Sequence, residues 1–443
     1  MSDYMFMLEN HLSAEQNRVV SQVQAAAAEA NMSLFLTGGA MRDMLGGYAV
    51  RDLDFTVEGN ALKLARAVVR KTGAKVLATD EHRKKVELLF PGRVTAEIGM
   101  ARQERYPKPG ARPQVTPATI HEDLHCRDFS VDAIALSLNR ASLGLLVDPT
   151  IGLADLERKE LRAVYNRALY DDPARILRLV RLRVRLGFTL EERTRQQYEN
   201  VRAEGLESRI PPSRWLEELH HIASESSPAD IVRALDQEKL LRLFSPALTG
   251  PKANLTGLTK LQKARQLVPF GVPFRVENFG LFMHFLTEKL APKERTGLIK
   301  ATGMRAADVG LWQKLERRAK KLERELKSPK LNRPSQIYQV LWKAPGELIL
   351  LLLIRSPIRL VQDRTRHYLQ KYLPAAQEVT EQEVKAKGGE PGTAKYRKLK
   401  EELIAARLNA RPKRPAPEGP AAPPALPAPG DPRNAKRMLA RLP

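Results

Sequence analysis

The stretch LTGGAMRDMLGGYAVRDLDFTV, residues 36–57, combines a glycine pair with two closely spaced carboxylates. Asp52 and Asp54 are two residues apart in an apolar run, so on a strand their side chains point to the same face. Two carboxylates side by side repel each other unless a cation neutralises them. The pair therefore predicts a divalent metal site on a strand.

Gly38 and Gly39 stand between an expected strand and an expected short helix. Glycine lets the backbone approach an anion closely, and the amides at a helix N-terminus favour negative charge. A tight turn without a ligand uses the same pattern, so the glycines alone do not decide. Arg42 lies one helical turn further on, and Asp52 and Asp54 follow. Together these residues predict a triphosphate site with two Mg²⁺ ions that is suited to phosphoryl transfer.

The composition indicates a folded protein with a polyanionic partner. A chain of 443 residues with 43% hydrophobic residues predicts two to four domains. The 74 Lys and Arg residues outnumber the 51 Asp and Glu residues, which gives a formal net charge of +23. Such an excess favours nucleic acid as the partner over a merely solvated basic surface. The single cysteine, Cys126, excludes an internal disulfide framework and a Cys-rich zinc site.

No segment has the features of a signal peptide or a membrane span. The N-terminus carries early acidic residues, and the most apolar run, LILLLLI at 348–354, is far shorter than the roughly 20 residues of a spanning helix. We therefore expect a cytoplasmic protein that has no membrane partner, and the sequence identifies no protein partner.

The chain changes character along its length. Strand and helix patterns alternate over roughly the first 140 residues, with a basic, Pro-rich loop expected at 102–118. From about residue 155 to about 380 the pattern is helical. A further helix, TAKYRKLKEELIAARLNA, is expected before a Pro/Ala-rich end that cannot bury enough apolar surface to fold.

Further motifs follow the glycine and carboxylate segments in a fixed order. They are EDLHCRDFSVDA at 122–133, VDPTIGLADLERKEL at 147–161 and DDPARILRLVRLRVRLGF at 171–188, with a looser SRWLEEL at 213–219. With GGAMRD and RDLDF, this series resembles the motifs of the class II tRNA nucleotidyltransferase and bacterial poly(A) polymerase family. The resemblance is tight over 36–188 and elsewhere extends only to helical character.

The resemblance implies an α+β fold whose polymerase-beta-like nucleotidyltransferase head has a small mixed sheet and precedes all-α parts. We expect the head at 1–154, a neck with the base-reading helix at 155–220, a helical body at 221–275 and a helical tail at 276–380. Residues 381–443 are expected to form a helix and a disordered Pro/Ala-rich C-terminus.

The resemblance also assigns roles to residues at matching positions. Asp52 and Asp54 match the catalytic, metal-binding carboxylates, and Glu97 is a candidate third ligand or an ordinary strand residue at even odds. The residues that match nucleotide contacts are Gly38, Gly39, Arg42, Arg127, Asp128, Asp172, Arg175, Arg178 and Arg181. Of these, Asp172 and Arg175 match the pair that reads the edge of the incoming base.

The helix after Asp172 carries an arginine stripe that is independent of the resemblance. At 100° per residue, Arg175, Arg178, Arg181 and Arg185 fall on one flank, and apolar residues fall on another. Such a stripe usually faces solvent. Beside a carboxylate pair it also forms a basic wall suited to phosphates, and the neighbouring motifs favour that interpretation.

The chain departs from the family pattern at three places. Cys126 and Asp132 replace an arginine and an asparagine, and Thr150-Ile151-Gly152 replaces a phenylalanine-glycine-glycine sequence. Asp132 adds a negative charge beside the expected sugar and triphosphate contacts. The metal carboxylates are unaffected.

The resemblance implies template-independent addition of nucleotides, CCA or part of it, to the 3′ end of tRNA. CTP and ATP are the expected substrates, with two Mg²⁺ ions and release of pyrophosphate. The alternatives are a poly(A) polymerase acting on other RNA 3′ ends and a catalytically inactive RNA-binding relative. An enzyme that modifies antibiotics or proteins fits less well, because the basic charge and long helical half favour a large RNA.

Overall fold

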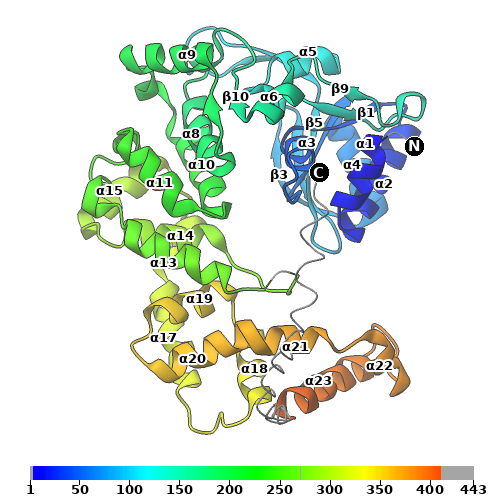
Figure 1. Ribbon diagram of the computed structural model, residues 1–443, viewed down its shortest axis with the longest axis vertical. Coiled ribbons are helices and arrows are strands. Elements are labelled where there is room, and N and C mark those ends of the chain that lie inside the picture. Colours follow the sequence, from blue (N-terminus) through cyan, green and yellow to red (C-terminus); the bar gives the residue numbers. More distant parts are fainter. Residues whose placement is uncertain (1–2, 270, 411–443) are drawn as a thin grey trace, which may run out of the picture.

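A mixed seven-stranded sheet forms the N-terminal part of the computed structural model, which describes residues 3–269 and 271–410 (Figure 1). Its order is β3-β4-β5-β2-β1-β8-β9, with β2 and β5 parallel and the other neighbours antiparallel. Its strands are β1 (Ser33–Thr37), β2 (Leu53–Glu58), β3 (Lys75–Asp80), β4 (Lys85–Leu89), β5 (Thr95–Met100), β8 (Ala135–Ser137) and β9 (Leu146–Val147). The remaining strands form two pairs, β6 (Arg102–Arg105) with β7 (Gln114–Pro117) and β10 (Glu160–Leu161) with β11 (Thr189–Leu190).

Helices cover the sheet because alternate strand residues are apolar. Leu53, Phe55 and Val57 of β2 are at most 2% exposed and belong to a core shared with α2 and α4. A smaller core packs Phe35 of β1 against α5. The helices of this part are α1 (Asp3–His11), α2 (Ala14–Glu29), α3 (Gly38–Leu45), α4 (Ala61–Thr72), α5 (Ile120–His125), η1 (Ser130–Asp132), η2 (Arg140–Ser142) and α6 (Gly152–Arg158).

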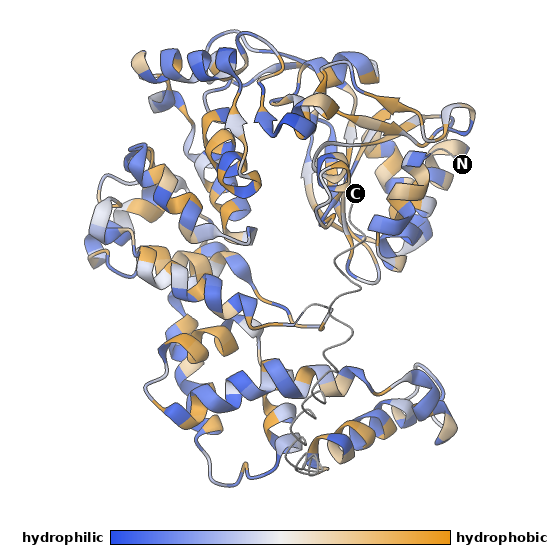
Figure 2. Ribbon diagram, in the orientation of Figure 1, coloured by the Kyte–Doolittle hydropathy of each residue, from blue (hydrophilic) through white to orange (hydrophobic). Residues whose placement is uncertain are grey.

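The rest of the described chain is helical and extends away from the sheet in a curved column (Figure 1). The first group comprises α7 (Ala168–Asp171), α8 (Arg175–Leu186), α9 (Glu192–Ala203), η3 (Leu206–Arg209), α10 (Pro212–Ser224), α11 (Pro228–Gln237), α12 (Leu241–Phe244), η4 (Gly250–Lys252) and α13 (Leu255–Gln266). The second comprises α14 (Asn278–Thr287), α15 (Pro292–Thr302), α16 (Ala306–Gln313), α17 (Leu315–Leu326), α18 (Pro334–Lys343), α19 (Gly346–Arg355), α20 (Arg359–His367), η5 (Tyr368–Tyr372), α21 (Leu373–Gln377), α22 (Glu381–Ala386) and α23 (Ala394–Asn409). Apolar residues concentrate in α14 and α19, which are largely buried (Figure 2).

Helix α8 connects the sheet to the helical column. Leu177 and Val180 are at most 1% exposed and face the core, while four of its arginines, Arg175, Arg178, Arg181 and Arg185, line the cavity beside the sheet. The helix ends at Gly187, whose left-handed backbone (φ 69°) lets its amide bond the Arg183 carbonyl. The apolar and basic flanks predicted from the sequence are therefore both present.

The predicted α+β class and the mixed sheet are confirmed. The expectation of a loop at 102–118 is wrong at both ends, because β6 and β7 pair there as a hairpin. The proline and basic residues of this segment are typical of a loop, so the sequence did not indicate the two short strands. The helix expected near the C-terminus is α23, and the domain boundaries remain predictions. The Pro/Ala-rich segment at 411–443 lies outside the described residues, so its predicted disorder also remains a prediction.

Over residues 3–269 and 271–410, no single helix has the length and apolarity to cross a membrane. The pair α18 and α19, bent by 118° at the break between them, meets that test by length and composition alone.

Ile151 and Gly152 make opposite demands on the backbone at the start of α6. Ile151 is 51% exposed and has a left-handed backbone at φ 56°, which costs a β-branched residue roughly 1–2 kcal/mol. Gly152 leaves no room for a side chain, because a Cβ there would overlap the Ser130 carbonyl oxygen.

We expect Ile151→Gly to raise the free energy of unfolding by up to about 1 kcal/mol, because relief of strain exceeds the added chain entropy. Gly152→Ala is the contrasting variant and lowers stability through the clash with Ser130. Denaturant unfolding of both variants measures these effects. A destabilised Ile151→Gly protein would contradict the strain.

Candidate active site

The end of β1 turns sharply into α3 at Gly38 and Gly39. Gly38 has φ +66°, and a Cβ there would lie 3.1 Å from Arg127 Nη1 and 3.2 Å from Asp54 Oδ2. The Gly39 amide donates a hydrogen bond of 3.1 Å to Asp54 Oδ2. The glycines thus bring the N-terminus of α3 against a carboxylate of β2, as the sequence predicted for a close backbone approach.

Three carboxylates lie at the edge of β2 and β5. Asp54 and Glu97 are register neighbours on these parallel strands. Asp52 precedes β2 instead of lying on it, and its Oδ1 accepts a 2.5 Å hydrogen bond from Thr95 Oγ1. The period-two argument therefore placed Asp52 on the wrong element, although it lines the same cavity as Asp54.

The electrostatics of Asp54 suit a cation. Burial, together with the charges of Glu97 and Asp52, raises the pKa of Asp54 to about 7. Glu97 is partly neutralised by Lys85, whose Nζ lies 2.8 Å from Glu97 Oε2. In the described part of the chain, no group of three or more His, Cys, Asp or Glu side chains is arranged as a complete metal cage. One or two carboxylates completed by substrate phosphates are the usual Mg²⁺ arrangement, so Asp52 and Asp54 fit that ion.

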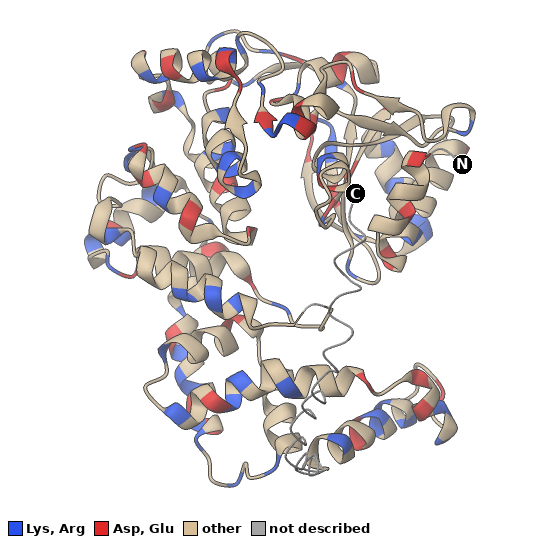
Figure 3. Cartoon of the chain, in the orientation of Figure 1, with Lys and Arg blue, Asp and Glu red and all other residues tan. Residues whose placement is uncertain are grey.

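The arginines of α8 face acidic residues of the head across the cavity. Arg175 Nε lies 2.6 Å from Asp128 Oδ1, and Arg178 Nη1 lies 3.1 Å from Asp128 Oδ2. Red acidic positions on the sheet side face blue basic positions on α8 in Figure 3. The stripe therefore lines the cavity and pairs with acidic residues, and it is not a solvated face.

Asp132 is a second acidic residue that pairs with an arginine of α8. Its Oδ1 lies 2.5 Å from Arg42 Nη1, and its Oδ2 lies 2.6 Å from Arg178 Nη2. Burial opposes ionisation, but Arg42 and Arg178 outweigh it and hold the Asp132 pKa well below its usual range. The extra negative charge noted in the sequence is thus neutralised by two arginines.

Arg127 and Arg181 are also engaged within the protein. Arg127 Nη2 donates to Thr37 Oγ1 at 3.1 Å and Thr56 Oγ1 at 2.9 Å, and it pairs with Asp123 at 2.8 Å. Arg181 pairs with Glu218 at 2.5 Å and with Glu225 at 3.0 Å. Both arginines therefore help to fix the walls of the cavity.

Asp172 has two partners at the start of α8. Its Oδ1 accepts a 3.1 Å hydrogen bond from the Ala174 amide, which is a helix-capping contact. Its Oδ2 accepts a 3.1 Å hydrogen bond from Arg214 Nη2 of α10. Arg175, its expected partner in base reading, instead contacts Asp128, the Tyr165 hydroxyl and two backbone carbonyls.

One cavity of about 360 Å³ contains every candidate residue named from the sequence. These residues are Gly38, Gly39, Arg42, Asp52, Asp54, Glu97, Arg127, Asp128, Asp172, Arg175, Arg178 and Arg181. They come from α3, β2 and the residue before it, β5, the segment before η1, and α8 with the turn that precedes it. Glycines, carboxylates and arginines that are up to about 140 positions apart therefore share one site.

Comparison with known proteins finds sequences similar to this chain. A family model described as the poly(A) polymerase head domain matches residues 34–162. An A-adding tRNA nucleotidyltransferase of Aquifex aeolicus is 30% identical over 341 residues, covering 76% of this chain and 40% of that protein. A CC-adding tRNA nucleotidyltransferase of Deinococcus radiodurans is 35% identical over 203 residues, covering 46% of this chain and 53% of that protein. Over these ranges the chain is similar to the poly(A) polymerase head domain and to A-adding and CC-adding tRNA nucleotidyltransferases.

The fold of the whole chain has solved counterparts. A structure of a CCA-adding enzyme, apo form II, has a TM-score of 0.54 and 23% identity, covering 93% of this chain and 96% of that chain. The chain spans about half the length of the curated relatives it matches, 40% of the Aquifex protein and 47% of an A-adding enzyme from Geobacter sulfurreducens.

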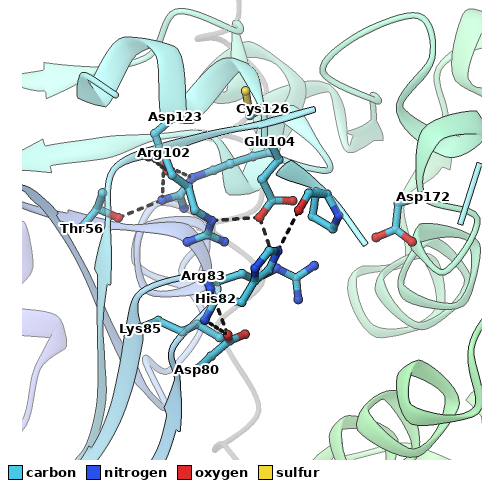
Figure 4. A network of polar contacts seen from close by, with 12 residues as sticks. Thr56, Asp80, His82, Arg83, Lys85, Arg102, Glu104, Asp123, Cys126 and Asp172 are labelled. Atoms are coloured by element: carbon cyan, nitrogen blue, oxygen red, sulfur yellow. Dashed lines mark hydrogen bonds and ion pairs between the residues drawn. The ribbon is translucent and has the colours of Figure 1, made fainter. Parts of the chain in front are cut away.

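Sequence reasoning missed a second polar cluster in the cavity. Glu104 of β6 pairs with Arg102 at 2.9 Å and Arg83 at 3.2 Å, and it accepts a 2.8 Å hydrogen bond from the Tyr106 hydroxyl. Burial alone would raise the pKa of Glu104, but the charges of Arg102 and Arg83 have the larger effect and lower the pKa to about 2. Figure 4 shows this cluster on the head side, with Asp172 opposite on the neck side. The alternating charges of RQER were the only local signal.

The raised pKa of Asp54 predicts a measurable pH effect in the absence of metal. The folded protein keeps a proton that the unfolded chain has lost between about pH 4 and 7, so stability falls as pH rises through this range. Asp54→Asn should therefore gain stability relative to the wild type as pH rises from 5 to 8, by about 1–3 kcal/mol, allowing for solvent screening.

Mg²⁺ provides the matched test of the same carboxylate. At pH 8 the ion should raise the melting temperature of the wild type and leave Asp54→Asn almost unchanged. Thermal unfolding at both pH values, with and without Mg²⁺, measures this. Equal effects of the substitution at pH 5 and pH 8 would contradict the raised pKa.

Proposed function

We propose that this chain transfers nucleotides from CTP or ATP to the 3′ end of tRNA and releases pyrophosphate. The observation that carries the proposal is one cavity in which the Asp52–Asp54 pair faces the arginines of α8. Carboxylates at one side suit metal-bound phosphates, and polar residues at the other suit a nucleobase. The +23 charge supports a large polyanionic acceptor.

Asp52 and Asp54 are the proposed catalytic carboxylates that hold two Mg²⁺ ions. When bound, these ions would activate the attacking 3′-hydroxyl and neutralise the leaving pyrophosphate. Glu97 is proposed to adjust the charge of Asp54, because the two residues are register neighbours and Lys85 already pairs with Glu97.

The remaining site residues are proposed to bind and orient the nucleotide. The Gly38–Gly39 turn allows phosphate oxygens to approach the backbone, and Arg42 and Arg178 lie behind it, linked through Asp132. Arg127 and Asp128 would set the sugar position. Arg181 would support the wall through its two glutamate partners.

Asp172 and Arg175 are proposed to read the base edge. Cytosine N4 and adenine N6 are donors that a carboxylate accepts, whereas uracil and guanine present a carbonyl oxygen at that position. Arg214 holds one oxygen of Asp172 in this structure, so a base would compete with Arg214 for it. Arg175 has partners on all three nitrogens and would have to exchange one of them.

The relatives support CTP, ATP and tRNA as the proposed substrates, and they favour one product among the possible ones. Solved structures of CCA-adding enzymes with 23% identity are described as complexes with tRNA, CTP or ATP, at TM-scores of 0.51 to 0.53. Three relatives of 30%, 25% and 32% identity are A-adding enzymes, which supports terminal A addition as the specific activity. We propose the cytoplasm as the compartment, where tRNA, CTP and ATP occur together.

Product length distinguishes these activities. tRNAs ending at the discriminator base and at CC are incubated with CTP, ATP or both, in the presence of Mg²⁺. We expect one added residue on the CC-ended tRNA with ATP, and no product from Asp52→Ala or Asp54→Ala. If the products instead carry CC alone, CCA or a long A tail, the proposed specific activity changes from A addition to the activity that the product shows. No extension of either tRNA, or near wild-type rates in both variants, would overturn the proposal.

Asp172 gives a sharper test of base selection. Asp172→Asn keeps an oxygen to cap the Ala174 amide but places a donor where the base needs an acceptor. We expect a small loss of thermal stability, because the amide nitrogen faces Arg214, and discrimination against UTP and GTP relaxed by roughly tenfold or more, matching a mismatch of about 1–3 kcal/mol.

Asp172→Ala removes both functions and should relax selection and also weaken the helix start. Competition assays with mixed nucleotides measure the selectivity of both variants. If Asp172→Asn selects nucleotides as the wild type does, and the alanine variant loses more stability, Asp172 is a helix cap and does not read bases.

A further inference from the structure

The segment that carries Asp52 has no regular secondary structure between α3 and β2, so it depends on side-chain contacts. Gln16 Nε2 donates a 2.9 Å hydrogen bond to the Val50 carbonyl, and Thr95 donates to Asp52. Both contacts come from the head. Arg51 instead extends to Glu225, at the end of α10.

Glu225 binds arginines from both sides of the cavity. Its Oε2 lies 3.1 Å from Arg51 Nη1 of the head, and its Oε1 lies 3.0 Å from Arg181 Nη1 of α8. Arg185 Nε of α8 lies 3.6 Å from Oε2. The Glu225 side chain is 2% exposed. Burial raises its pKa, but Arg51, Arg185 and Arg181 outweigh that effect, so the carboxylate is charged.

The three arginines depend on Glu225 to different degrees. Arg181 also pairs with Glu218, and Arg185 also pairs with Asp43 at 2.7 Å. Within the described residues, Glu225 is the only carboxylate paired with Arg51. The contact between Arg51 and Glu225 is therefore the step that links the Asp52 segment to α8.

We propose that Glu225 is a positioning residue for nucleotide transfer, which holds the Asp52 segment, through Arg51, at a fixed distance from α8. This inference rests on the proposed function, because α8 would hold the nucleotide and Asp52 the metal. Glu225 touches neither group. Its effect is geometric, since a displacement of about 1 Å at a reacting centre can cost on the order of a hundredfold in rate.

Arg51→Ala is the principal test, because Arg51 is 41% exposed and its removal should leave the fold intact. We expect kcat for nucleotide addition to fall at least about tenfold, with the KM for nucleotide and the affinity for tRNA little changed. Arg51→Lys should recover most of kcat, because an ammonium can still pair with Glu225.

Glu225→Gln keeps the shape of the side chain and removes its charge, so it should lower kcat in the same way. The double variant should be no slower than Glu225→Gln alone, since the Glu225 substitution already removes the ion pair that Arg51→Ala removes. Arg18→Ala is the matched control, because Arg18 is 68% exposed on α2, pairs among the described residues only with Glu15 and lies outside the cavity. It should retain wild-type kinetics.

Two results would overturn the positioning role while leaving nucleotide addition intact. One is a wild-type kcat in Arg51→Ala. The other is a loss in which melting temperature, tRNA affinity and kcat fall together, which would indicate a purely structural contact. If the wild-type chain itself extends no tRNA, the proposed function fails and this inference fails with it. The kinetics of the wild type and of Arg51→Ala therefore separate the two failures.

Discussion

The site depends on the neutralisation of buried arginines. Arg42, Arg175, Arg178, Arg181 and Arg185 lie between the sheet and the helical column, where an unpaired charge would be costly. Each is paired with a carboxylate, and partners alternate across the interface from Arg51 through Glu225, Arg185, Asp43, Arg42, Asp132, Arg178 and Asp128 to Arg175. Four of these eight links join the head to α8 and a fifth joins it to the end of α10, so the same charges that line the cavity also fix its two walls.

This arrangement explains why Asp132 is compatible with the site. An additional carboxylate beside the nucleotide would repel phosphates if it stood alone. Here Arg42 and Arg178 share it, and the pair of contacts connects α3 to α8. The substitution changes the pattern of partners without leaving an uncompensated charge.

The sequence predicted the parts of the site that local patterns determine. Gly38, Asp54 and the arginine flank of α8 follow from turn chemistry, alternation and helical period, and the structure brings them together. Asp52 was assigned to the correct cavity and the wrong element, because a two-residue spacing does not reveal where a strand begins.

Long-range partners were not predictable in this way. Arg214 and Asp172 are 42 residues apart, and Arg51 and Glu225 are 174 apart, so no local period connects them. The strands β6 and β7 were hidden by prolines and charges that usually mark loops. These contacts depend on how the helices pack against the sheet, which the sequence does not display.

The charge balance of the cavity constrains the form in which a nucleotide can enter. Eleven Lys or Arg and ten Asp or Glu side chains line it, so it is nearly neutral despite its arginines. A free triphosphate carries several negative charges and would have to displace the acids from their arginine partners. A triphosphate accompanied by divalent cations is close to neutral and can place the cations at Asp52 and Asp54. On the proposed function, the carboxylate pair and the paired arginines would therefore select the metal-bound nucleotide as one unit, with its phosphates towards the sheet and its base towards α8.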